Sequence, residues 1–300
     1  MRIALASTSV LGVPTLSKLI EQGHVVTSLI SKPAKKSGRG LVEHQTEIEI
    51  AAEQAGISKF VPNSPNELKQ HLIETKPDIA IAISYGEIIR EEALQIPKHG
   101  WLNLHFSLLP KYRGAAPVQR AILAGETVSG FTIFRLDQGL DTGPIFTQHK
   151  VEINNGNAGE ILESMAKLGA SKIPEVIKMI EAGDQPTAQV GEPSIAKKID
   201  KSETKIDWLK SATSIVQQVR ALSPKPGAWT TLNEKRLKLE QIQTAPGQGA
   251  PGSIIKRDPL LVATGDGAIA IEVLRPESGK SLSAQDWLRG ARIDENARFL

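Results

Sequence analysis

The first thirty residues contain two apolar runs separated by a helical pattern, and this order constrains the fold more than any other feature. RIALA at 2–6 and HVVTSLI at 24–30 are predicted strands, and PTLSKLIEQ at 14–22 is a predicted helix that begins with Pro and ends before Gly23. A strand, a helix and a second strand in this order are typical of the opening of a parallel α/β sheet. We therefore expect a layered α/β domain at the N-terminus.

The same alternation continues along the chain. We expect helices near 43–54, 64–75 and 117–124, strands at 77–84, 101–106, 130–136 and 143–153, and a long helical segment at 156–183 that is interrupted or bent near Pro174. After a polar stretch and a helix near 208–222, five short strands joined by Gly and Pro turns predict a small β-barrel. A last helix at 283–291 is expected to start at Ser283, with Asp286 completing a capping pair.

These patterns divide the chain into two predicted domains. We place the α/β domain at residues 1–189, a linker at 190–207 and the β-barrel domain at 208–300. The formal net charge is only +3, which is too small to indicate a nucleic-acid-binding protein. Residues 205–300 carry 14 Lys and Arg against 10 Asp and Glu, an excess that an ordinary surface and an RNA-binding surface explain about equally well.

Several classes of protein and site are excluded or disfavoured. The chain has no Cys, so it has no disulfide, thiolate metal site or Cys nucleophile, and it has no apolar run long enough to span a bilayer. The six His residues show no metal-ligand spacing, and we expect no metal site. GQGAPG at 247–252 matches a dinucleotide-binding pattern, but a strand-like segment follows it where that site needs a helix, so we interpret it as a loop.

Polar residues alternate with apolar ones at the end of a predicted strand. In WLNLHFSLLP, at 101–110, Asn103, His105 and Ser107 share one face of an extended chain, and Pro110 ends it. Polar groups are costly in the middle of a strand packed on both faces, but ligands bind at the carboxyl ends of strands in open α/β sheets. Each residue alone fits a strand end that bonds to nearby loops, whereas the set together favours an active site.

A second candidate segment is RLDQGLDTGPIF at 135–146. Asp137 and Asp141 flank Gly139 in what is, by pattern, a turn between two strands. A carboxylate on a rigid turn can also orient an imidazole. Spacing does not show that Asp141 meets His105, which lies 36 residues earlier in the chain.

Taken together, NLHFSLLPKYRGAAPVQRAI, GLDTGPIF and the C-terminal PGSI and VATGDGAIAIEVLRPESGKSLSAQDWLRG resemble the methionyl-tRNA formyltransferase family over nearly the whole chain. The resemblance implies a Rossmann-like formyltransferase domain followed by an OB-like barrel that helps to hold tRNA. It implies transfer of a formyl group from 10-formyltetrahydrofolate to the α-amino group of methionine on initiator methionyl-tRNA. No metal and no obligate protein partner are implied, and the expected location is cytoplasmic.

The resemblance also assigns roles to residues. The catalytic trio of the family matches Asn103, His105 and Asp141. The folate-contacting residues match Ser107, Leu108, Leu109 and Pro110, Ser84, Tyr85, Gly86, Ile88 and Ile89, and Gly139 and Leu140. A loop that contacts tRNA in the family corresponds to residues 31–40, with Lys35, Lys36 and Arg39.

Two alternatives use the same scaffold. A sugar-nucleotide formyltransferase would keep the catalytic trio and the folate loop but would bind a small nucleotide in its second domain. A non-catalytic RNA-binding or folate-binding protein would keep the fold alone, and the intact trio of Asn103, His105 and Asp141 argues against it.

Overall fold

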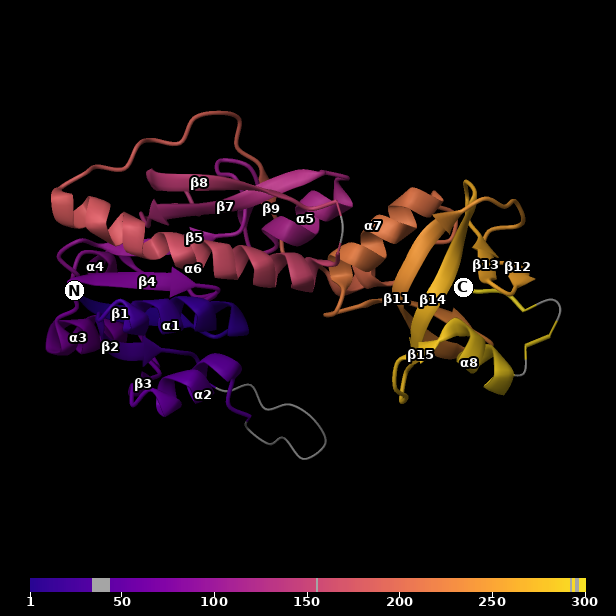
Figure 1. Cartoon of the computed structure of the whole chain (residues 1–300), viewed down its shortest axis with the longest axis horizontal. Helices are drawn as coiled ribbons and strands as arrows, with labels where there is room; N and C mark the ends of the chain where they lie inside the picture. Colours follow the sequence, from indigo (N-terminus) through magenta and orange to yellow (C-terminus); the bar gives the residue numbers. More distant parts are fainter. Residues whose placement is uncertain (34–43, 155, 292, 295–296) are drawn as a thin grey trace. The chain divides into compact units, whose positions relative to one another are not determined.

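The computed structural model describes residues 1–33, 44–154, 156–291, 293–294 and 297–300 (Figure 1). The described chain forms two compact units. The first comprises Met1–Pro117, Val128–Glu152 and Leu162–Ala196, and the second comprises Val118–Thr127, Ile153–Ile161 and Lys197–Leu300. The limits that we predicted at residues 189 and 207 stay predictions, because the chain passes between the compact units more than once.

A seven-stranded sheet organises the first unit, in the order β3-β2-β1-β4-β5-β7-β8. Its strands are β1 (Arg2–Ser7), β2 (Val25–Ile30), β3 (Lys59–Phe60), β4 (Ile79–Ile83), β5 (Trp101–His105), β7 (Val128–Arg135) and β8 (Ile145–Glu152). The five strands from β3 to β5 pair in parallel, and β7 and β8 extend the sheet antiparallel. The predicted α/β class is confirmed, and so is the predicted pairing of the strands near 130–136 and 143–153.

The direction in which strands are added changes between β1 and β4. β2 and β3 follow β1 on one side, while β4 and β5 are added on the other side. Ligands in open α/β sheets bind outside the carboxyl ends of the strands at such a point. The end of β5, which carries His105, lies at this edge of the sheet.

Helices cover the sheet (Figure 1). They are α1 (Val13–Glu21), α2 (Glu47–Gln54), α3 (Pro65–Thr75), α4 (Glu91–Leu94), α5 (Pro117–Leu123) and α6 (Ala158–Ala182). A Cβ atom at Gly169 would lie 2.6 Å from Leu104, so the lack of a side chain lets α6 pack directly on β5. Of the predicted interruption or bend near Pro174, the interruption is absent, because α6 is one continuous helix from Ala158 to Ala182, and the bend stays a prediction.

An antiparallel sheet forms the second unit, in the order β10-β11-β14-β13-β12, with β15 paired to β14. Its elements are β10 (Ala228–Leu232), β11 (Lys235–Ala245), β12 (Ile254–Arg257), β13 (Leu260–Ala263), β14 (Ala268–Pro276), β15 (Leu282–Ser283), α7 (Ala212–Leu222) and α8 (Ala284–Gly290). The helix expected near 208–222 begins at Ala212, since Ser211 caps it by accepting a bond from the Ser214 amide. The predicted cap of α8 is confirmed, with the Ser283 hydroxyl 3.0 Å from the Asp286 amide nitrogen.

The end of the chain joins the two edges of this sheet. Phe299 bridges to Leu232 of β10, and Arg298 bridges to Ser253 just before β12. Phe299 is almost fully buried and packs with Trp208 in the core of the unit. These bridges satisfy backbone groups that an open sheet would leave unpaired at its edges.

Candidate active site

β5 holds two of the predicted residues on one face. Asn103 pairs with Ala82 of β4 and Phe134 of β7, and His105 pairs with Thr132 of β7. Alternate residues of a strand share a face, so the two side chains follow one another at about 7 Å along the strand. His105 is buried, whereas Asn103 is half-buried. The strand therefore places an amide and an imidazole together at the carboxyl edge of the sheet.

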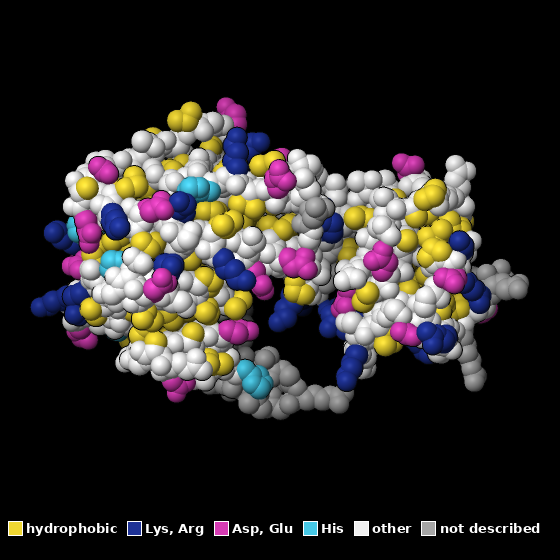
Figure 2. Space-filling model, in the orientation of Figure 1, with side chains coloured by type: hydrophobic (Ala, Val, Ile, Leu, Met, Phe, Trp, Pro, Cys, Tyr) yellow, Lys and Arg dark blue, Asp and Glu magenta, His cyan; other side chains and the backbone are white. Residues whose placement is uncertain are grey.

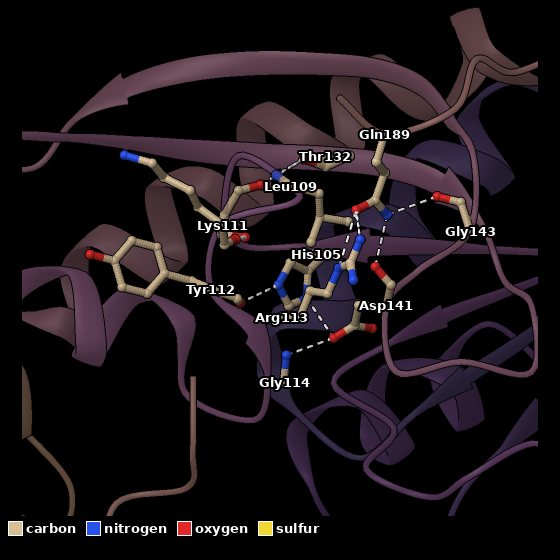
Figure 3. Close-up of polar contacts among 11 residues, drawn as sticks. His105, Leu109, Lys111, Tyr112, Arg113, Gly114, Thr132, Asp141, Gly143 and Gln189 are labelled. Atoms are coloured by element: carbon tan, nitrogen blue, oxygen red, sulfur yellow. Dashed lines mark hydrogen bonds and ion pairs between the residues drawn. The ribbon is translucent and has the colours of Figure 1, made fainter. Parts of the chain in front are cut away.

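The two nitrogens of His105 face different partners (Figure 3). Nε2 lies 2.9 Å from the carbonyl oxygen of Tyr112, and Nδ1 lies 3.7 Å from Oδ2 of Asp141. A carbonyl oxygen can only accept a hydrogen bond, so Nε2 carries a proton and donates it. Nδ1 is consequently the ring atom that faces the carboxylate.

Asp141 reaches His105 from the turn between β7 and β8. Its backbone has φ 52°, in the left-handed region that few residues other than Gly, Asn and Asp adopt. Oδ2 accepts a hydrogen bond of 2.7 Å from the Gly114 amide. The turn is braced by Asp137, whose carboxylate accepts bonds from the Gly139 amide and the Thr142 hydroxyl. The fold thus unites two predicted residues that are 36 positions apart.

The predicted folate segment at Ser107–Pro110 is bonded to the neighbouring strands. The Thr132 hydroxyl donates to the Ser107 carbonyl at 2.6 Å and accepts from the Leu109 amide at 3.2 Å. The Gln148 amide donates to the Leu109 carbonyl at 2.7 Å and to the Thr132 hydroxyl at 3.0 Å. The buried Ser107 hydroxyl donates to the Lys111 carbonyl at 2.6 Å. Ser107 therefore braces the loop.

The remaining predicted folate residues divide into buried and exposed groups. After β4, Tyr85 and Ile89 are buried, while Ser84, Gly86 and Ile88 are exposed, and so are Gly139 and Leu140 in the second turn. Burial, and after it the charge of Glu87, raises the pKa of Tyr85 to about 12, so its phenol stays neutral. Ile88 and Leu140 are the exposed apolar side chains of these two segments.

Lys32 at the end of β2 braces the segment after β4. Its ammonium donates to the Gly86 carbonyl and pairs with the Glu87 carboxylate at 2.9 Å. It also lies 5.9 Å from the centre of the Tyr85 ring. The Thr8 hydroxyl donates to the Ser84 carbonyl at 3.0 Å. Bonds from two other strand ends thus fix this segment.

Several residues that support the site were missed from the sequence. Thr132, Gln148 and Gln189 all bond to the two predicted loops. Polar residues on the predicted strands at 130–136 and 143–153 were a signal for Thr132 and Gln148. No periodicity marks Gln189, which lies in the polar stretch after α6. The predicted Lys35, Lys36 and Arg39 lie outside the described residues.

Among the described residues, no group of three or more His, Asp and Glu side chains is arranged to hold a metal ion. The helices within the same residues include none that is both long and apolar enough to cross a membrane.

Comparisons with known proteins cover both units. A family model described as formyl transferase matches residues 1–177, and the model of the formyl transferase C-terminal domain matches residues 198–292. Methionyl-tRNA formyltransferases of Acidothermus cellulolyticus and Corynebacterium glutamicum strain R are 36% and 37% identical, each aligned over 100% of both chains. HypX from Aquifex aeolicus, solved with tetrahydrofolic acid, shares the fold with a TM-score of 0.71 at 20% identity, over 96% of this chain and 47% of that one.

Proposed function

Because the chain belongs to the methionyl-tRNA formyltransferase family, we propose that it transfers the formyl group of 10-formyltetrahydrofolate to the α-amino group of methionine on initiator methionyl-tRNA. The product, N-formylmethionyl-tRNA, serves translation initiation, and the reaction takes place in the cytoplasm. The placement of the Asp141 carboxylate 3.7 Å from Nδ1 of His105 is the observation that carries the proposal.

The reaction moves an acyl group from one amine to another. The methionine amine attacks the formyl carbon, the carbonyl oxygen becomes an oxyanion, and N10 of the folate leaves with a proton. Asn103 and His105 lie on one face of β5, where their N–H groups are suited to stabilise the oxyanion. Since Nε2 of His105 is bonded to the Tyr112 carbonyl, donation to the substrate uses a proton on Nδ1.

Asp141 handles the proton in this scheme. The attacking nitrogen loses a proton as the new C–N bond forms, and the departing N10 gains one as the old bond breaks. A carboxylate held by the Gly114 amide and beside Nδ1 of His105 is placed to accept the first proton and return it, through a water molecule. No covalent intermediate on the protein is needed, and the Ser107 hydroxyl, bonded to a carbonyl, is not used as a nucleophile.

The folate donor is proposed to lie against three segments at the carboxyl edge of the sheet. They are Ser107–Pro110, the exposed turn with Gly139 and Leu140, and the segment from Ser84 to Ile89. Ile88 is 89% exposed and Leu140 is 57% exposed, and burying such apolar groups under a flat ring system is favourable. Backbone groups of these braced turns supply the polar contacts.

An in-register row of side chains on the second unit supports the tRNA partner. Trp229 of β10 is directly opposite Lys238 of β11, and Lys238 is opposite Arg275 of β14. The Arg236 guanidinium lies 4.0 Å from the centre of the Trp229 ring. Cations beside an exposed or half-exposed aromatic ring are typical of surfaces that bind phosphates and stack bases. We propose this row as part of the tRNA-binding surface, together with Lys35, Lys36 and Arg39.

One assay tests the proposal and separates it from the alternatives. The protein is mixed with 10-formyltetrahydrofolate and methionine-charged initiator tRNA under single-turnover conditions, with the Asp141→Asn variant as the control. Formylmethionyl-tRNA from the wild-type protein is the expected result. Formylation of an amino sugar nucleotide in its place would support a sugar-nucleotide formyltransferase, and the absence of any product would support a non-catalytic binding protein.

A further inference from the structure

Gln189 lies between the segment that follows β5 and the turn that carries Asp141 (Figure 3). It belongs to the extended segment after α6, and its side chain is half-buried. Its Oε1 accepts two bonds from the Arg113 guanidinium, from Nη2 at 2.6 Å and from Nε at 3.2 Å. Its Nε2 donates to the carbonyls of Asp141 and Gly143, each at 2.8 Å. One amide therefore joins the loop after β5 to the turn after β7.

These partners fix the orientation of the amide. A guanidinium only donates hydrogen bonds and a carbonyl only accepts them, so Oε1 must face Arg113 and Nε2 must face the turn. All four bonds use the donor and acceptor capacity of the amide. Glu cannot donate to the two carbonyls, Lys cannot accept from Arg113, and Asn is shorter by one methylene.

The four bonds complete a closed ring of contacts. Arg113 is followed in the chain by Gly114, whose amide donates to Oδ2 of Asp141 at 2.7 Å. The Asp141 carbonyl, in turn, accepts from Gln189 at 2.8 Å. Asp141 is thus held both at its carboxylate and at its backbone, in a left-handed conformation that it would leave more readily if one hold were lost.

We propose that Gln189 is a positioning residue for catalysis, which sets the Asp141 carboxylate against Nδ1 of His105. This inference rests on the proposed function, because it assumes that Asp141 handles a proton during formyl transfer. Gln189 acts through Asp141 and makes no contact with the reacting atoms in this scheme. A misplacement of about 1 Å in a catalytic group can cost about 10²-fold in rate.

The experiment compares Gln189→Ala and Gln189→Glu with a control in the same segment, Gln185→Ala. Gln185 is exposed and donates to the Gly183 carbonyl. We expect both Gln189 variants to lower kcat by about 10-fold to 10²-fold, with the KM for 10-formyltetrahydrofolate changed less than about 3-fold. Gln185→Ala should retain the wild-type kcat. A Gln189 variant with wild-type kcat would overturn the proposal.

A double-mutant comparison separates positioning from a general loss of structure. If Gln189 acts through Asp141, the variant that combines Gln189→Ala with Asp141→Asn should turn over at the rate of Asp141→Asn alone. Multiplication of the two losses would contradict the proposal. If the Ala variants do not fold, Gln189→Glu is used in the same comparison, because its carboxylate can still bind Arg113.

The ¹⁵N spectrum of the His105 imidazole provides a measurement that does not depend on activity. We expect Gln189→Ala and Gln189→Glu to shift the Nδ1 signal in the direction that Asp141→Asn shifts it, and Gln185→Ala to leave it unchanged. A wild-type protein without formyltransferase activity would refute the proposed function, yet these shifts would still test the position of Asp141. Unshifted signals in an active enzyme would refute only the role of Gln189.

Discussion

The carboxyl edge of the first sheet and the outer row on the second sheet place their polar groups in different ways. At the edge, β5 carries Asn103 and His105, and a turn carries Asp141. Side chains such as Thr132 and Gln189 fix the backbone of the neighbouring loops. In the row, the strand register places Trp229, Lys238 and Arg275 opposite one another, and a polar contact of each side chain adds to it. A loop permits an unusual backbone conformation, as at Asp141, but it depends on each side-chain hydrogen bond that holds it. The register of a strand pair is kept when one side chain is lost.

The two regions also differ in how charge is used. Figure 2 shows Lys and Arg side chains interspersed with Asp and Glu side chains on the face of the first unit that it presents, among the described residues. In the row, burial and the nearby charges of Arg275 and Arg236 lower the pKa of Lys238. We therefore expect a single substitution at the edge to lower turnover strongly. A single substitution in the row should lower tRNA affinity only several-fold.

The largest effect is expected from Asp141→Asn. Asn tolerates the left-handed backbone, and its amide oxygen can still accept from Gly114, so the change removes mainly the charge and the proton acceptor. We expect turnover to fall by about 10²-fold to 10⁴-fold, with tRNA affinity nearly unchanged, in single-turnover and filter-binding assays. Unchanged turnover would contradict the proposed role of Asp141. It would also contradict our expectation that single substitutions at the edge lower turnover strongly.

Thr132→Val tests the brace under the folate segment. The variant keeps the shape of the side chain but leaves the Ser107 carbonyl and the Leu109 amide without this partner. We expect a loss of about 1–3 kcal/mol in the free energy of unfolding and weaker folate binding, measured by urea denaturation and calorimetry. Thr244→Val, at an exposed position of β11, is the matched control and should change neither quantity. Wild-type stability and folate affinity in Thr132→Val would show that the edge does not depend on its braces.

Lys238→Gln tests the row. The change removes the positive charge of the lysine ammonium, which also donates to the Pro226 carbonyl at 2.8 Å. We expect tRNA affinity to fall several-fold and the slope of log affinity against log salt to become shallower by about 1. Lys178→Gln, at an exposed position of α6, should leave the slope unchanged. An unaltered slope in Lys238→Gln would exclude this residue from the tRNA surface.

The smallest expected effect is a loss of stability at acid pH. It concerns the first unit, because that unit contains all the His residues. The six His residues lie at positions 24, 44, 71, 99, 105 and 149, and all precede the second sheet. Burial lowers the pKa of His71, with a smaller opposing effect of Glu74, and His71 stacks on Phe60 and contacts the Ser28 hydroxyl at 2.8 Å. The unfolded chain therefore binds a proton on this ring at a higher pH than the folded chain does.

The stability that neutral His71 contributes is full above its unfolded pKa of about 6.5 and is lost as the pH falls below that value. We expect urea denaturation of the wild-type protein to show lower stability at about pH 5.5 than at about pH 7.5, and His71→Gln to show a smaller difference. The fluorescence of Trp101 reports the first unit, and Trp208, Trp229 and Trp287 report the second. An equal pH dependence in both proteins would remove His71 as its source.

Much of the fold could be predicted from local patterns. Continuous apolar runs marked the buried strands, and Ser283 marked the start of α8, which its hydroxyl caps. The two-residue strand β3 (Lys59–Phe60) was missed, because two residues carry no periodicity. Pro174 was expected to interrupt or bend the helix, but α6 continues through it, with one face buried. Tertiary packing outweighs the local cost of Pro there.

Less of the site could be predicted from local patterns. Alternation indicated that Asn103 and His105 share a face, whereas the partnership of His105 with Asp141 came only from the resemblance. Gln189 lies in a polar stretch, and its four bonds depend on how the chain returns to the loop after β5. Contacts between residues this far apart in the sequence cannot be predicted from periodicity.

The position of Gln189 in the chain bears on how the site is completed during synthesis. Proteins are made from the N-terminus, and a nascent chain that has released only residues 1–182 already contains both loops and helix α6. It still lacks the amide that joins Arg113 to the Asp141 turn. We expect the growing polypeptide to form its first sheet before the Asp141 carboxylate is held in place, because Gln189 is made only after α6.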